Sequence, residues 1–335
     1  MWERLVTVLA CPGCHGDLHS RNDEVGVDGD ILSGSLRCEK CESEFPIVRG
    51  IPRFVPESNY AHSFGFQWNR FRAEQIDTEN RTHLSENRFR SETGWTTEFL
   101  AGKWVLEVGC GAGRFLEVAS RSSAEVVGFD LSNAVDAARR TVAGRRNAHL
   151  VQASVYSPPF RLGAFDACYC IGVLQHTPEP LQALGSLPPL LGPFGHIALT
   201  IYERRRWTTL NGKYFARRLT RHLPDSVLMT LITLVMPVAF PITDLLYRLP
   251  LVGRLFQFAI PVANYVHNPQ LNLRQRYRWA LMDTFDMLAP AHDQPLTQSE
   301  VEDVLAHEGI TIRRLNNPGL NVVGHKLPLV QCEKA

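Results

Sequence analysis

The amino-acid sequence predicts an α/β protein with a small metal-binding unit at its N-terminus, and three observations support this prediction. A short apolar run that is compatible with a buried strand, Val105 to Val108, leads into glycines at positions 109, 111 and 113. A second apolar strand starts at Val126 and ends in Asp130, about twenty residues after the glycine loop. Four cysteines lie within the first 41 residues as two C-x-x-C pairs. A chain of 335 residues therefore has room for one full core and a smaller appendage.

The overall composition is that of a globular protein. Hydrophobic residues make up 44% of the chain and charged residues 21%, and the formal net charge is +1. A chain so close to neutral has no global field that would attract nucleic acid. Any binding of a polyanion must therefore be local.

The N-terminal cysteines predict a structural zinc site. Cys11 and Cys14 in CPGC are separated by 23 residues from Cys38 and Cys41 in CEKC, which suits one tetrahedral Zn²⁺ held by four thiolates. Four sulfur ligands leave no open position for an activated water. The segment between the pairs is expected to form a small hairpin, too short to be stable without the metal. Paired cysteines without a secretion signal favour a reducing, cytoplasmic location.

The residues around these cysteines carry a family resemblance. LACPGCHGDL, followed by LRCEKCESEFPIVRGIPRFVP, resembles the zinc-ribbon family of small methyltransferase activators over about the first 56 residues. Members of that family bind and stabilise methyltransferases, so the resemblance implies an activator-like module fused to its own client. The alternative is an unrelated ribbon that serves only as a stability cap.

The glycine loop excludes one common ligand motif. A dinucleotide fingerprint needs a small residue where this chain has Arg114. The spacing is instead E-x-G-x-G-x-G, beginning at Glu107, and it lets the backbone pass beneath a ligand without interference from Cβ atoms. Asp130, at the end of the next strand, can accept hydrogen bonds from both hydroxyls of a ribose. Together these features indicate an adenosine-type ligand without choosing among the possible ones.

The segments that follow identify the adenosine-type ligand through their resemblance to a known family. Together with EVGCGAG and GFDLS, the stretches HLVQASVYSPPF, FDACYCIGVLQHTPEP and LLGPFGHIALTIY resemble the S-adenosylmethionine-dependent methyltransferases of the doubly wound class I fold. The resemblance extends from about residue 100 to 202. It implies a seven-stranded sheet whose last two strands, in ITIRRLNN and NVVGHKLPLV, form an antiparallel pair after an amphipathic helix at 296–309.

The same resemblance implies a set of S-adenosylmethionine-binding residues. It assigns the methionine part to Glu107, Gly109, Gly111 and Gly113, the ribose to Asp130, adenine to Ser154 and Val155, and the closing edge to Ile171 and Gly172, with Leu131 as a further cofactor contact. One position departs from the family pattern, because Ser154 stands where the family usually has Asp. The acceptor for the adenine amino group is therefore weakened, or the serine hydroxyl supplies it.

Methyl transfer from a sulfonium is an in-line displacement, so alignment matters most and a general base is optional. His176 in VLQH follows the fourth strand and is one candidate base. His292 in PAHDQP is a second, with Asp293 to orient it. In the alternative, His176 only packs or caps locally, and the His292–Asp293 pair forms a turn and helix cap.

A segment before the core is a further candidate for ligand contact. SFGFQWNRF, residues 63–71, resembles the part that closes over the cofactor in a subset of these methyltransferases. Gln67, Trp68 and Arg70 are its candidate ligand contacts. The alternative is an amphipathic helix that packs its aromatic side chains on the core.

A long insertion follows the fifth strand. It opens with a basic cluster between Arg204 and Arg221 and continues into an apolar stretch from Val227 to Thr243. Asp225 and Asp244 bound this stretch, and the prolines at 237 and 241 are expected to interrupt it, which argues against a membrane-spanning helix. Three interpretations stay open: a helical lid, contact of residues 204–263 with a membrane or lipid, and a dimer interface.

The expected domains are a zinc ribbon at 1–56, a connecting helical segment over the cofactor site at 57–98, a methyltransferase core at 99–203 and 281–332, and a helical lid at 204–280. The expected activity is methylation of a small, partly apolar molecule, with oxygen favoured as acceptor. Methylation of tRNA or of a protein is the alternative within enzymes, although no basic stripe extends beyond 204–221. A noncatalytic scaffold that binds cofactor or a partner is the alternative outside enzymes.

Overall fold

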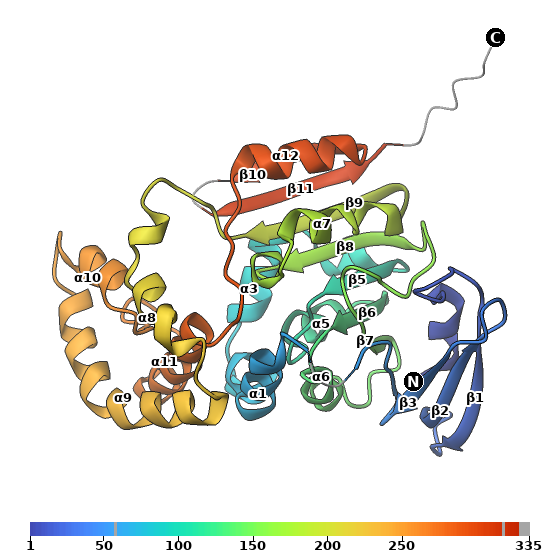
Figure 1. Ribbon diagram of the computed structural model, residues 1–335, viewed down its shortest axis with the longest axis horizontal. Helices are drawn as coiled ribbons and strands as arrows, with labels where there is room; N and C mark the ends of the chain where they lie inside the picture. Colours follow the sequence, from blue (N-terminus) through green and yellow to red (C-terminus); the bar gives the residue numbers. More distant parts are fainter. Residues whose placement is uncertain (57–58, 317–318, 328–335) are drawn as a thin grey trace, which may run out of the picture.

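The computed structural model describes residues 1–56, 59–316 and 319–327. Figure 1 shows an antiparallel N-terminal sheet at one end, a central sheet with helices, and a group of helices at the other end. Residues 57–58 of the expected connecting segment and residues 328–332 of the expected core lie outside the described residues.

The N-terminal unit is a four-stranded antiparallel sheet in the order β1-β2-β3-β4. Its elements are η1 (Glu3–Val8), β1 (Leu18–Val25), β2 (Ile31–Cys38), β3 (Glu44–Val48) and β4 (Ile51–Pro52). The hairpin expected between the cysteine pairs is the β1–β2 pair, which registers Leu18 with Cys38. That prediction is confirmed.

The central sheet has seven strands in the order β10-β11-β9-β8-β5-β6-β7. Its strands are β5 (Trp104–Val108), β6 (Glu125–Asp130), β7 (Ala148–Gln152), β8 (Phe165–Ile171), β9 (Leu191–Ile201), β10 (Ile310–Asn316) and β11 (Leu320–Lys326). β5 to β9 pair in parallel, whereas β11 pairs antiparallel with both β9 and β10. The class I sheet implied by the resemblance is therefore confirmed.

The two faces of this sheet carry separate cores, as alternation along buried strands requires. On β5, Leu106 and Val108 belong to the core on one face, and Val105 belongs to the core on the other. The first core includes α7 (Pro180–Gly185), η4 (Pro188–Leu190) and α12 (Gln298–His307). The second includes α3 (Leu84–Thr93), α4 (Thr97–Leu100), α5 (Arg114–Ala119) and α6 (Val135–Thr141). α12 has the expected capping box, in which Thr297 and Glu300 exchange hydrogen bonds.

The N-terminal unit covers the exposed edge of the central sheet. β7 is an edge strand, and the chain after β4 joins it through a parallel bridge between Arg53 and Gln152. η1 lies nearby, because Leu9 forms an antiparallel bridge with Phe160. An unpaired edge is a site for unwanted strand pairing, so the N-terminal unit protects this side of the sheet.

Short helices connect the N-terminal unit to the core. They are α1 (His62–Arg70), η2 (Arg72–Gln75), α2 (Asp77–Asn80), α3 and α4. α1 contacts both α6 of the core and α11 of the helical insertion.

The insertion is helical and follows β9. It contains η5 (Thr208–Leu210), α8 (Gly212–Thr220), α9 (Asp225–Tyr247), α10 (Gly253–Ala259) and α11 (Leu273–Leu288). The boundary predicted between residues 280 and 281 is wrong, because it falls inside α11. The expectation that Pro237 and Pro241 interrupt the apolar stretch is also wrong, because α9 continues through both prolines.

Candidate active site

Two joined cavities lie at the carboxyl ends of β5, β6 and β8, where doubly wound sheets bind ligands. The larger has a volume of about 350 Å³ and the smaller about 60 Å³. Both are lined by Phe64, Gly109, Asp130, Val173 and His176. One elongated ligand can therefore occupy both, with its middle at Asp130.

The glycines of this loop occupy positions where any side chain would collide with neighbouring residues. A Cβ on Gly109 would lie 2.5 Å from the side chain of Val173, and one on Gly111 would lie 3.1 Å from Nε1 of Trp68. Both glycines also have positive φ, at 71° and 50°. Both line the larger cavity, as predicted.

Gly113 has a different role from the one predicted. It does not line either cavity and instead stands before α5, with φ at 80°. A Cβ there would lie 3.2 Å from Ala138 of α6. Gly113 therefore allows α5 and α6 to pack closely.

Asp130 links the glycine loop to the second strand. Its Oδ2 accepts from the Gly111 N–H (2.9 Å), and its Oδ1 accepts from the N–H and hydroxyl of Ser132 (2.8 and 2.7 Å). Burial raises the pKa of this carboxyl, and the hydrogen bonds from Ser132 and Gly111 oppose the rise. The carboxylate is thus held rigidly at the junction of the two cavities.

Glu107 contributes a carboxyl group to the larger cavity. The residue is 3% exposed, and its Oε2 has no hydrogen-bond partner within the described residues. Burial raises its pKa well above the ordinary value. A buried, unpartnered carboxyl oxygen is costly unless a ligand satisfies it, and an ammonium group would do so.

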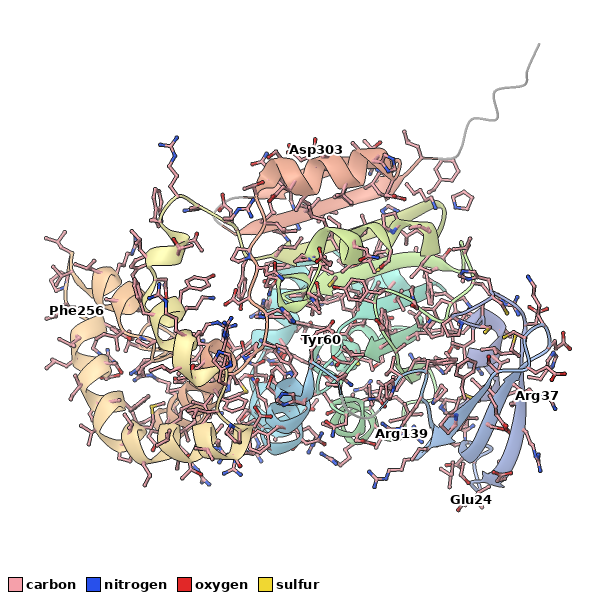
Figure 2. All side chains as sticks on the ribbon, in the orientation of Figure 1. Glu24, Arg37, Tyr60, Arg139, Phe256 and Asp303 are labelled. Carbon is pink, nitrogen blue, oxygen red and sulfur yellow. The ribbon has the colours of Figure 1, made fainter. Side chains whose placement is uncertain are left out.

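The smaller cavity has the character of an adenine pocket. Leu131, Ala153 and Val155 line it from the core, and Tyr60 lines it from the segment before α1. Figure 2 shows Tyr60 between the insertion and the central sheet. Leu131 and Val155 are thus brought to the site as predicted, and Ile171 and Gly172 line the larger cavity.

Ser154 is outside the lining of both cavities. Its hydroxyl oxygen accepts from the Tyr156 N–H at 3.2 Å. The serine hydroxyl therefore stabilises the local turn, and its place beside the adenine stays a prediction.

The two histidines occupy different cavities. His176 is 7% exposed and lines both cofactor-side cavities. His292 lines a separate cavity of about 300 Å³ beside α8, together with Arg217, Arg218 and Arg221, and its ring lies 5.4 Å from the ring of Tyr60. Asp293 does not orient His292, because it pairs with Lys213 at 2.6 Å. The expected orientation of His292 by Asp293 is therefore wrong, and the role of His292 as a base stays a prediction.

His292 still contributes to the site through its backbone. His176 Nδ1 lies 3.1 Å from the His292 carbonyl oxygen. A carbonyl oxygen only accepts, so Nδ1 carries the proton and the Nε2 of a neutral ring keeps its lone pair. The ring of His176 also packs between Phe64 and Tyr202, with centroids 5.2 and 5.6 Å away.

The segment at 63–71 contributes aromatic side chains to the larger cavity. Phe64 and Trp68 line it, whereas Gln67 and Arg70 do not. Gln67 is 1% exposed, and Arg70 is exposed at the surface. Of the three candidate contacts, the structure brings only Trp68 to the cavity.

Sequence reasoning missed four charged residues of the larger cavity. Arg88 and Arg114 line it from the core side, and Asp283 and Asp286 line it from α11. Burial and Asp286 raise the pKa of Asp283 to about 8, and burial and Arg88 lower the pKa of Arg114 to about 9. The i, i+3 spacing in DTFD was the available signal, since it puts both carboxyls on one helix face, but it does not say what that face meets.

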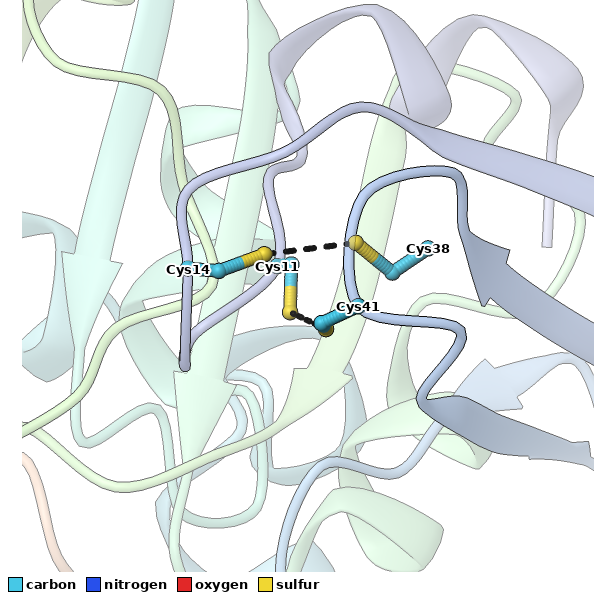
Figure 3. Close-up of side chains that lie close together, drawn as sticks. All are labelled: Cys11, Cys14, Cys38 and Cys41. Atoms are coloured by element: carbon cyan, nitrogen blue, oxygen red, sulfur yellow. Dashed lines mark hydrogen bonds between the residues drawn. The ribbon is translucent and has the colours of Figure 1, made fainter.

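The four N-terminal cysteines form one cluster (Figure 3). All four Sγ atoms lie within 4.8 Å of one another, with Cys11 and Cys41 at 3.6 Å and Cys14 and Cys38 at 3.4 Å. Sulfur ligands of a tetrahedral Zn²⁺ with Zn–S bonds of ~2.3 Å lie about 3.8 Å apart. The cluster is compatible with a structural zinc ion, as predicted.

The two cysteine knuckles have the same backbone design. In each, the residue after the second cysteine has positive φ: His15 at 54° and Glu42 at 61°. Each of these residues donates its N–H to the carbonyl of the first cysteine, and the first cysteine N–H donates to the next residue along, Gly16 or Ser43. A Cβ on Gly16 would lie 3.0 Å from Cys38 Sγ. The loops are therefore shaped around the sulfur cluster.

Comparison with known proteins agrees with this geometry. Residues 106–199 match the methyltransferase domain family, and residues 3–50 match the Trm112p-like protein family. The chain joins a Trm112p-like domain to a methyltransferase domain. The first of these holds the four cysteines, and the second holds the glycine loop and Asp130.

The curated relatives match the methyltransferase domain. The ubiquinone biosynthesis O-methyltransferase of Acinetobacter baumannii is 30% identical over 129 residues, which cover 37% of this chain and 54% of that protein. The corresponding protein of Vibrio campbellii is 29% identical over 127 residues, with the same coverage. The chain thus spans about half the length of the curated relatives it matches.

The methyltransferase domain also has distant structural neighbours. A complex of the Haloferax volcanii Trm112 methyltransferase activator with a methyltransferase is 10% identical, with a TM-score of 0.45, and covers 79% of this chain and 98% of that one. A likeness of this degree carries no argument about function.

Proposed function

We propose that this chain transfers a methyl group from S-adenosylmethionine to a small molecule, with an oxygen atom as the acceptor. The observation that carries the proposal is the cleft itself: Gly109, Gly111, the fixed Asp130 carboxylate and the buried Glu107 carboxyl all belong to the larger cavity or its lining loop. The resemblance of the core to ubiquinone O-methyltransferases supports the choice of oxygen.

The residues of the cleft fit this cofactor group by group. Glu107 would accept from the ammonium of the methionine part, and the bare backbone at Gly109 and Gly111 would let that part lie close to the loop. Asp130 would accept from the ribose hydroxyls, and Leu131 and Val155 would pack against the adenine. When bound, the cofactor supplies an electrophilic methyl group, and the protein has to align the acceptor with it.

His176 is the proposed base for the acceptor hydroxyl. Its Nδ1–H donates to the His292 carbonyl, which fixes the ring and leaves Nε2 to accept a proton. Asp283 and Asp286 lie on the insertion side of the same cavity and would bind polar groups of the acceptor. Phe64, Trp68 and Met287 would contact its apolar part.

The insertion contributes to this function as a lid. Ala263, Tyr265 and α11 line the larger cavity, so the insertion closes the side of the cleft opposite the sheet. The proposed partners are a small, partly apolar acceptor and no nucleic acid, and the proposed location is the cytoplasm.

Calorimetric titration with S-adenosylmethionine tests the cofactor site. We expect micromolar binding to the full chain and a loss of roughly tenfold to a hundredfold in Gly109→Ala, because the added Cβ meets Val173. Gly144→Ala is the matched control, since Gly144 has φ at 80° but nothing within 4 Å of its Cβ position. No heat with the wild-type chain would favour a noncatalytic scaffold over an enzyme.

The base is tested separately by the rate of methyl transfer. General-base catalysis contributes about a hundredfold or more, so His176→Ala should lose that factor in kcat with a hydroxylated quinone precursor as acceptor. Cofactor binding should change little in the same variant. Unchanged turnover at saturating acceptor would exclude His176 as the base and leave the cofactor site intact.

A further inference from the structure

The long helix of the insertion is apolar on both of its sides. Its inner side packs in a core with α11, through Leu228, Met229, Ile232, Met236 and Phe240. Its outer side exposes large apolar side chains to solvent: Val227, Leu231, Leu234, Val235, Val238, Ile242 and Leu245. Surface helices of globular proteins normally carry polar residues on the outer side, so this side requires an explanation.

The polar residues on the outer side do not need water either. The Thr230 hydroxyl donates to the Ser226 carbonyl, and the Thr233 hydroxyl donates to the Met229 carbonyl, each at 2.7 Å. These bonds satisfy the hydroxyl protons within the helix itself. The outer side of α9 is therefore apolar and presents few unsatisfied hydrogen-bond donors to an apolar environment.

The apolar surface continues past the end of α9. Leu249, Leu251, Val252 and Leu255 are exposed in the following turn and in α10. α10 lies at the far end of the molecule from the Trm112p-like domain, as the labelled Phe256 and Arg37 show (Figure 2). We refer to the exposed apolar residues of 227–255 as the outer face.

The chain around the outer face is strongly basic. Residues 204–263 contain nine Lys or Arg and two Asp or Glu, a net charge of +7, whereas the other residues of the chain contain 26 basic and 32 acidic side chains, a net charge of −6. Both acids are already paired, Asp225 with His62 and Asp244 with Arg248 and Arg276. Within the described residues, Arg206, Arg218 and Arg254 make no ion pair, so their charge is available to an anionic partner.

We propose that the outer face docks on a membrane surface rich in anionic phospholipid. An apolar helix side that continues into α10, where Arg254 makes no ion pair within the described residues, is suited to lie in the interface, with its apolar side chains among the acyl chains and the cation at the phosphates. α9 is long and apolar enough to span a bilayer by length and composition, with a third of it buried. Spanning is not proposed, because the inner side packs against Phe285 and its neighbours in α11.

This docking would bring the cavity close to the membrane. α11 lies between α9 and the cavity, since Phe285 packs in the core with α9 while Asp283 and Asp286 line the cavity. The membrane would then lie one helix layer from the acceptor side of the cleft. The inference concerns the surface alone and does not depend on the proposed chemistry.

Sedimentation of the full chain with lipid vesicles tests the proposal. We expect binding to vesicles that contain phosphatidylglycerol, weaker binding to vesicles of phosphatidylcholine alone, and loss of binding at high salt. The double variant Leu234→Asp, Val238→Asp should bind at least about tenfold more weakly. Leu162→Asp is the matched control, because Leu162 is 68% exposed outside the insertion, comparable to 70% for Leu234 and 63% for Val238.

A second pair of variants tests whether vesicle binding requires positive charge near the outer face. Arg254→Glu should weaken binding by roughly fivefold or more, whereas Arg21→Glu, on β1 of the Trm112p-like domain, changes the net charge equally and should have no effect. Circular dichroism and S-adenosylmethionine binding verify that each variant is folded.

Three results would overturn the proposal. These are no vesicle binding by the wild-type chain, equal binding to neutral and anionic vesicles, and equal loss in the Leu162→Asp control. Analytical ultracentrifugation adds a further one: a wild-type dimer that dissociates in the double variant, without vesicle binding, would identify the outer face as an interface between two copies of the chain.

Discussion

The two additions to the methyltransferase domain attach to it in opposite ways. The Trm112p-like domain shares a core with the sheet, since Leu5 and Leu9 belong to the same cluster as Phe160 and Phe165. The insertion has a core of its own, built from α9 and α11, which meets the rest of the chain mainly at α1 and η2. The first addition is therefore a structural part of the sheet, and the second is a separate layer with apolar surface left over.

Ion pairs follow the same division. Arg4 pairs with Glu125 and Arg139 pairs with Asp30, both across the joint between the Trm112p-like domain and the core. In the stretch that carries the outer face, by contrast, Arg248 pairs with Asp244, and Arg254 makes no ion pair within the described residues. A surface whose charged groups form ion pairs within the chain has a structural role. A surface that exposes both unpaired charges and apolar side chains is suited to bind a partner.

Of the changes that test this difference between the two additions, removal of zinc is expected to have the largest effect on stability. Structural zinc contributes on the order of 10 kcal/mol to the folding of small domains, so Cys14→Ser or a strong chelator should unfold the Trm112p-like domain and expose the edge strand β7. Thermal unfolding and metal content measure this. Cys332→Ser, far from both pairs in the sequence, is the control, and unchanged stability without metal would contradict a structural role for the site.

Asp283→Asn is expected to change how stability depends on pH. The pKa of Asp283 is raised to about 8 in the folded chain, above its ordinary value in the unfolded chain, so the folded state holds this proton more tightly. The free energy of unfolding should therefore fall as the pH rises from about 4 to about 8. The asparagine variant should lose less stability over that range, by about 1 kcal/mol or more.

Denaturant unfolding at several pH values measures this effect. Asp303→Asn, an exposed carboxyl on α12 (Figure 2), is the control and should leave the pH dependence unchanged. A parallel pH dependence in wild type and Asp283→Asn would show that the insertion does not bury this carboxyl in solution.

The smallest expected effect concerns the joint between the Trm112p-like domain and the cofactor site. Arg53 donates to Gln152 Oε1 at 2.6 Å, and Gln152 Nε2 donates to the carbonyl of Leu131, which lines the smaller cavity. One hydrogen bond contributes about 1 kcal/mol, so Arg53→Ala should weaken S-adenosylmethionine binding about fivefold by titration.

Arg4→Ala is the control that distinguishes an effect on the position of Leu131 from an effect on the stability of the fold. It removes another contact across the same joint, but its partner Glu125 is at the opposite end of β6 from Asp130. Equal losses of affinity in the two variants would mean that the joint stabilises the fold without positioning Leu131.

The sequence by itself predicted the glycine loop and the strand that ends in Asp130, and its resemblance to class I methyltransferases implied the seven-stranded sheet. Strand periodicity, the glycine spacing and the terminal Asp130 are local patterns, and parallel strands bring their carboxyl ends to one edge whatever else the chain does. The same holds for the cysteine pairs, because a tetrahedral metal needs only four thiolates at a suitable spacing. These predictions depended on near neighbours along the chain.

Only the tertiary structure decided which faces meet. Gly113 follows the motif but lies against α6, and the Ser154 hydroxyl bonds within a local turn, because the motif does not encode which neighbours pack against each position. Asp283 reaches the cavity and His292 does not, although both belong to the long segment after β9. In the same way, the apolar pattern of α9 shows a hydrophobic helix, and only its packing against α11 separates the buried side from the exposed one.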